Sequence, residues 1–80
     1  MKEEIVRIVE DNIKDLNLHV DDAFENEEEG QKVFNIVLDS DEPIDLNRIT
    51  EASKIINEQI KDVVPEYIDV VDIHSKEKGN

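Results

Sequence analysis

The stretch Lys32-Val33-Phe34-Asn35-Ile36-Val37-Leu38 decides the fold of this chain. Its apolar residues form an almost continuous run, which is typical of the central and most buried strand of a sheet. Polar segments bound the run on both sides: residues 27–30 end in a glycine that suits a hairpin loop, and residues 39–43 end in a proline that cannot join a ladder. We therefore expect residues 32–38 to be the central strand of a sheet.

A helix and a strand are expected before this central strand. Residues 2–15 carry apolar side chains three to four positions apart, which predicts a helix with one apolar stripe. Residues 18–25 then change to a period of two, which predicts a strand. On that strand Leu18, Val20 and Phe24 share the apolar face, and Ala23 falls on the opposite, polar face with His19, Asp21 and Glu25.

A second helix and a third strand are expected after it. Residues 46–61 repeat the helical spacing, and Asp45 is placed to cap the free amides of the first turn. Pro65 ends this helix, and residues 67–74 form the last strand. The buried stripe of the second helix is predicted to consist of Leu46, Ile49, Ala52, Ile56 and Ile60.

The order of elements is therefore α-β-β-α-β, an α+β fold of two layers. Two helices pack on one face of a three-stranded sheet, and the crossover through the second helix sets the last strand parallel to its neighbour. We expect one domain over residues 1–75 and a polar tail over residues 76–80. The core is predicted to contain Phe34, Ile36, Ile49, Ile56 and Val70.

The charge of the chain restricts its partners. Its 80 residues include 22 acidic and 9 basic side chains, for a net charge of -13, and they include no cysteine. Nucleic-acid affinity depends on Lys and Arg neutralising phosphates, so we expect no direct nucleic-acid binding. A basic protein partner fits better, although the same charge also serves solubility alone. Without a signal peptide or a long apolar run, the expected location is the cytoplasm, away from membranes.

Three stretches resemble the N-terminal domain of the RimP family of ribosome maturation factors. The first, residues 15–18, leads from the first helix into the first strand, and the second combines residues 37–39 with the helix entry at residues 44–47 and the small-Ser pair within residues 51–56. The third is Val64-Pro65-Glu66-Tyr67 before the last strand. The resemblance covers about residues 3–75. In that family a second, barrel-like domain follows, introduced by a Ser-Pro-Gly segment, of which only Ser75 is matched here.

The resemblance implies a role in assembling the small ribosomal subunit. Members of the family bind the immature subunit, contact a basic ribosomal protein and perform no covalent chemistry. We accordingly expect a non-catalytic binding module without cofactors. Its contact groups are expected in the loop after the central strand and on the exposed sheet face, namely Asp21, Asp39, Asp41 and Asp45.

Other chemistries fit the sequence less well. The spacing of Asp39, Asp41 and Asp45 is similar to that of a calcium loop, but Ile44 and Thr50 occupy the positions that need glycine and glutamate. His19 and His74 could hold zinc if their strands were neighbours, and a metal-binding regulatory domain like that of cation diffusion facilitators shares the element order. An acidic mimic of nucleic acid is a third interpretation.

Overall fold

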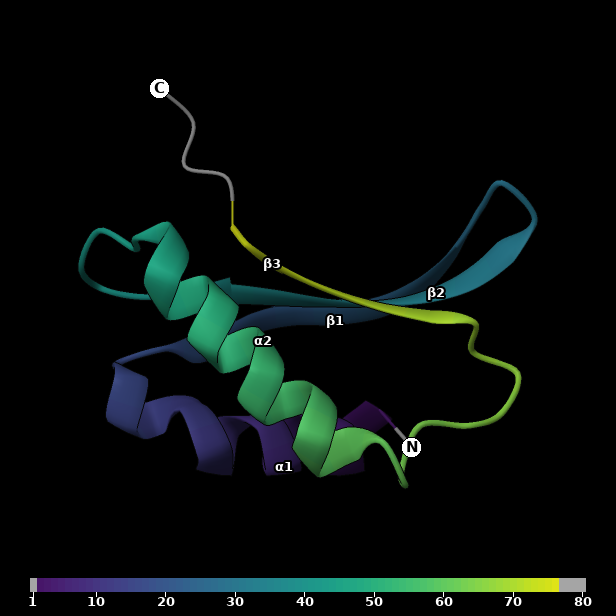
Figure 1. The fold of residues 1–80 in the computed structure, drawn as a ribbon, viewed down its shortest axis with the longest axis horizontal. Helices are drawn as coiled ribbons and strands as arrows, with labels where there is room; N and C mark the ends of the chain where they lie inside the picture. Colours follow the sequence, from purple (N-terminus) through teal and green to yellow (C-terminus); the bar gives the residue numbers. More distant parts are fainter. Residues whose placement is uncertain (1, 77–80) are drawn as a thin grey trace.

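The computed structural model describes residues 2–76 of the chain and confirms the predicted order of elements (Figure 1). Met1 and residues 77–80, which include most of the predicted polar tail, lie outside the described residues. A short 3-10 helix, η1, follows the first α-helix. The elements are α1 (Lys2–Ile13), η1 (Lys14–Leu16), β1 (His19–Glu28), β2 (Gln31–Asp39), α2 (Leu46–Ile60) and β3 (Val70–Ser75).

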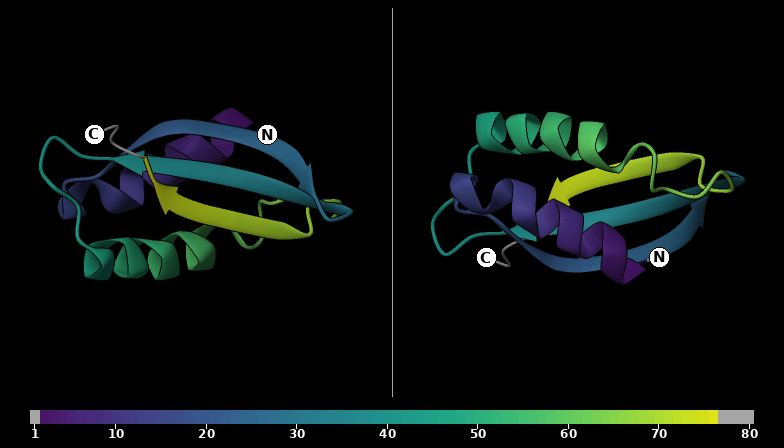
Figure 2. Two further views of the ribbon diagram at one scale, coloured as in Figure 1. Left: turned by 90° about the horizontal axis from the view of Figure 1, so that it is seen from above. Right: turned by 90° about the horizontal axis from the view of Figure 1, so that it is seen from below.

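The sheet has the order β1-β2-β3, so the predicted central strand is confirmed. β1 pairs with β2 antiparallel, and β3 pairs with β2 parallel, as the crossover through α2 requires. Both helices lie on one side of the sheet, and no described element covers the other side (Figure 2). We call this uncovered side the open face.

The core lies between the helices and the sheet. Phe34, Ile36 and Ile56 are buried there as predicted, and Ile49 is partly buried against the same cluster. Val70 was predicted in the core, and this is wrong, because 38% of the residue is exposed. Val70 is paired with Val33, whereas Val71 is paired with Phe34, so the parallel register turns Val71 to the core and Val70 to the open face.

A β-bulge in β1 reverses the predicted faces of the part of the strand that follows Asp21. Val20 pairs with Leu38 and Asp22 pairs with Val37, so Asp21 is an extra residue without a partner on β2. One extra residue moves every later side chain to the other face. Ala23, predicted on the polar side, is therefore buried in the core, and Phe24, predicted on the apolar side, is 40% exposed.

The β1–β2 hairpin is longer than the sequence predicted. Glu27 and Glu28, expected in a loop, continue β1, and the turn consists of Glu29 and Gly30 alone. Both residues have positive φ, 51° and 81°, which is the backbone of the tight turn that matches strand twist best. Figure 1 shows that the turn projects beyond both helices.

The first turn of α2 confirms one prediction and contradicts another. Asp45 caps the helix as expected, since its side chain accepts a hydrogen bond from the Arg48 backbone amide at 2.8 Å. Leu46 was assigned to the buried stripe, and this is wrong, because it is 83% exposed. The residues of this stripe become less buried toward the start of α2: Ala52 is fully buried, Ile49 only partly, and Leu46 not at all.

The third strand begins at Val70, three residues later than predicted. Ile68, which precedes it, still packs into the core cluster from the connecting segment. Tyr67 is more than half exposed, and its hydroxyl donates a hydrogen bond of 2.9 Å to Oε2 of Glu25 on β1. This hydrogen bond links the segment between α2 and β3 to β1, the outer strand on the other side of β2.

Candidate protein-binding surface

The four predicted contact acids lie at the end of the molecule opposite the hairpin turn. Asp39 ends β2 and pairs with His19, the first residue of β1. Asp21 follows two residues later on β1, Asp41 lies in the loop after β2, and Asp45 lies where that loop meets α2. The fold therefore brings these acids to one end of the domain, although they come from two separate segments, β1 and residues 39–45.

Asp21 is held by an ion pair. Its Oδ1 lies 3.3 Å from Nζ of Lys76, and the Lys76 backbone amide donates to the Leu38 carbonyl oxygen at 2.7 Å. The backbone of Lys76 is thus bound to β2, and its side chain extends from there to the Asp21 carboxylate. Asp21 therefore offers a partly compensated charge.

The loop after β2 is fixed by its own polar side chains. Asp39 Oδ1 accepts from the Ser40 amide at 2.8 Å, and the buried Ser40 hydroxyl accepts from the Glu42 amide at 3.2 Å. Asn17 then donates from Nδ2 to Glu42 Oε1 at 2.8 Å, which ties the loop to the segment after η1. These contacts restrain the loop, which lowers the entropy lost when a partner binds.

Asp45 has a structural task. Its carboxylate satisfies a free amide in the first turn of α2 and places negative charge where the helix dipole favours it. It remains exposed, so it also contributes to the field at this end of the molecule. Its removal therefore affects stability as well as any contact.

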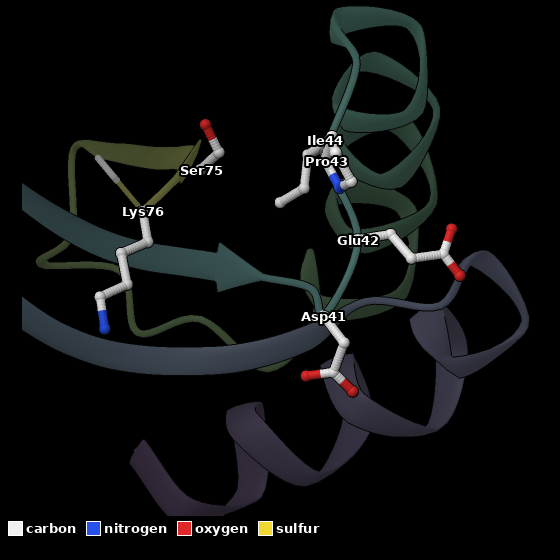
Figure 3. A pocket seen from close by; sticks show the side chains of 6 residues that line it. All are labelled: Asp41, Glu42, Pro43, Ile44, Ser75 and Lys76. Carbon is white, nitrogen blue, oxygen red and sulfur yellow. The ribbon is translucent and has the colours of Figure 1, made fainter. Parts of the chain in front are cut away.

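A pocket of about 530 Å³ lies between the loop and the end of β3. The lining consists of Asp41, Glu42, Pro43, Ile44, Ser75 and Lys76, shown in Figure 3. The Asp41 and Glu42 carboxylates point away from the Ser75 hydroxyl, so these polar groups do not converge on one point (Figure 3). Sequence reasoning missed Ser75 and Lys76 at this site, because only the parallel pairing of Leu38 with Ser75 brings the end of β3 beside the loop. It also missed Glu42, whose contact with Asn17 joins positions far apart in the sequence.

The open face forms the second part of the candidate surface. Val33, Asn35 and Val37 of β2 point to it, and all three are buried although no described helix lies over them. The two valines are outside the core cluster, which agrees with their place in the opposite layer. Exposed Phe24 and Val70 flank them on β1 and β3.

The histidines do not meet across the sheet. His19 lies on β1 and His74 on β3, with β2 between them. Among residues 2–76 no group of three or more His, Cys, Asp or Glu side chains is arranged to hold a metal ion. The three aspartates of the calcium-like spacing form no such group.

No family model matches the chain, and no curated protein matches its sequence. Within the described part of the chain, no helix has the length and apolar character needed to cross a membrane. A function must therefore be inferred from the fold, the charge and the two parts of the candidate surface.

Proposed function

We propose that this chain is a non-catalytic binding module that assists small-subunit assembly by docking on a basic ribosomal protein of the immature subunit, as the resemblance to the RimP N-terminal domain implies. The observation that carries the proposal is the position of Asp39, Asp41 and Glu42. These three acids lie on one fixed loop, in a chain whose net charge is -13.

Charge favours a basic protein over nucleic acid as the partner. An acidic domain repels phosphates, whereas a basic protein surface is attracted over the Debye length of about 8 Å at physiological salt. Complementary potentials raise the association rate and exclude wrong partners. Hydrogen bonds of the Asp39 and Glu42 carboxylates restrain the loop, which reduces the ordering cost of binding.

Co-sedimentation with three ligands tests this function. We expect the chain to bind immature small subunits, to bind mature subunits less and not to bind bare rRNA. Equal binding to bare rRNA would refute the charge argument. Absence of binding to either subunit would reduce the RimP resemblance to a similarity of fold.

A pair of charge-matched variants locates the contact. Asp39→Asn with Asp41→Asn removes two charges from the loop and leaves the Asp45 cap in place. Asp62→Asn with Glu66→Gln removes two exposed charges from the segment after α2, at the other end of the helix. We expect the first variant to weaken binding of immature subunits more than the second. Equal weakening would show that only net charge matters.

A further inference from the structure

The open face has a relief that suits an extended segment. The middle of this face is formed by β2, whose side chains there are almost fully buried: Val33, Asn35 and Val37 are only 3%, 5% and 9% exposed. Phe24 and Val70 stand higher on the two flanking strands, because each exposes more than a third of its surface. We call this arrangement, a buried middle row with one exposed apolar residue on each side, the trough.

Hydrogen bonding keeps the trough in shape. Asn35 donates from Nδ2 to Oδ1 of Asn26 at 3.0 Å, so the buried amide in the middle of the face has a partner on β1. At the other end the ion pair of Asp21 with Lys76 joins the two outer strands over the width of the sheet. The paired backbones of the three strands lie under the exposed apolar residues.

Acids stand beside the trough on both outer strands. Asp22 shares a row with Val37 and His74, and Asp72 shares a row with Asn35 and Phe24. Both aspartates are exposed. An apolar trough bordered by carboxylates complements a segment that carries both apolar and basic side chains. A second copy of this chain does not fit, since two molecules with a net charge of -13 repel each other.

We infer that the open face, defined by Phe24, Val33, Asn35, Val37 and Val70, is the docking surface for a basic protein segment in which apolar side chains alternate with lysine or arginine. The inference rests on the proposed function and names the surface that the partner covers. Apolar side chains of the segment contact Phe24 and Val70, and its cations lie beside Asp22 and Asp72. The negative charge of Asp39, Asp41 and Glu42 in the loop after β2 guides the approach of the segment, and the open face retains it once it is bound.

Two synthetic peptides of equal charge test this surface without any ribosomal component. One alternates Lys with Val, and the other alternates Lys with Ser. We expect the Lys-Val peptide to bind about tenfold more tightly in an NMR titration, because its valines bury the exposed parts of Phe24 and Val70. The largest shifts should fall on the backbone amides of β1 and β3 that flank the trough.

Matched variants separate this face from other exposed apolar groups. Phe24→Thr and Val70→Thr, each made singly, should remove most of the preference for the Lys-Val peptide. Leu46→Thr, which changes the most exposed apolar residue on α2, should keep it. Val70→Thr is nearly isosteric, so it tests the surface even if Phe24→Thr lowers stability, which a thermal melt reports.

The outcomes distinguish this inference from the proposed function. Equal binding of the two peptides, or loss of the preference in Leu46→Thr but not in Val70→Thr, overturns the assignment of the open face. Binding of immature subunits by the wild-type chain would still stand in that case. If the chain prefers the Lys-Val peptide but does not bind subunits, the open face is confirmed as a docking surface and the ribosomal partner is rejected.

Discussion

Lys76 Nζ lies 3.3 Å from Asp21 Oδ1, and this ion pair spans the central strand from one outer edge of the sheet to the other. Asp21 is the extra residue of the β1 bulge, so no residue of β2 pairs with it. The bulge thus has two effects: it exchanges the faces of Ala23 and Phe24, and it leaves an acid available to pair with the end of β3.

The Asp21–Lys76 pair should contribute little to stability. Both side chains are about one third to one half exposed, and exposed pairs are worth about 0.2–1 kcal/mol. A double-mutant cycle with Asp21→Asn and Lys76→Gln, measured by urea unfolding, should give a coupling in that range that decreases with salt. A coupling of several kcal/mol that is insensitive to salt would contradict the observed exposure.

Phe34→Ala should destabilise the domain severely. Phe34 is 1% exposed in the middle of the core, and deleting such a ring costs about 3–5 kcal/mol. A domain holds only about 5–15 kcal/mol in total, so the variant should melt far below the wild type or be unfolded. Phe24→Ala on the neighbouring strand is the control, and its loss should be clearly smaller because Phe24 is partly exposed.

Asp45→Ala should destabilise α2 through loss of its cap. Removing an N-cap side chain costs about 0.5–2 kcal/mol, and Asp45→Ser should recover most of it because serine also accepts from the first-turn amides. Asp41→Ala, earlier in the same loop, should stay within about 0.5 kcal/mol of wild type. Urea unfolding of the three variants provides the comparison. Equal losses for Asp41→Ala and Asp45→Ala would contradict a specific capping role.

The Tyr67–Glu25 contact should be visible in the titration of the phenol. The hydrogen bond to Glu25, assisted by partial desolvation and by the nearby negative charge, raises the pKa of the Tyr67 hydroxyl above its ordinary value. Because the folded-state pKa is raised, the stabilising contribution is present below the ordinary pKa of about 10 and is lost as pH rises through the folded-state value. Ultraviolet titration of the sole tyrosine should show a lower pKa in Glu25→Gln. An unchanged titration would show that the contact is not populated in solution.

The layers and the element order could be predicted from the sequence because they follow from local periodicity. The apolar run of β2, the stripe of Ile5, Val9 and Ile13 along α1 and the Asp45 cap are all short-range signals. The errors share a different origin. A single bulged residue moved Phe24 out of the core, and the parallel register moved Val70, and neither is encoded in the alternation of one strand considered alone.

The candidate surface was only partly predictable for the same reason. Asp39, Asp41 and Asp45 are close in sequence, so their common loop could be anticipated. Lys76 beside Asp21 depends on which strands are neighbours and on their register. The trough on the open face depends further on the bulge, since without it Phe24 would face the helices.

Recruitment of a basic partner by an acidic surface can be measured as the association rate of the chain with immature small subunits at increasing salt. We predict that this rate falls steeply with salt while the dissociation rate changes much less, because charge guides the approach and apolar contacts retain the complex. Asp39→Asn with Asp41→Asn should lower the rate at low salt toward its high-salt value. An association rate that is independent of salt, and unaffected by that double substitution, would contradict the proposed recruitment.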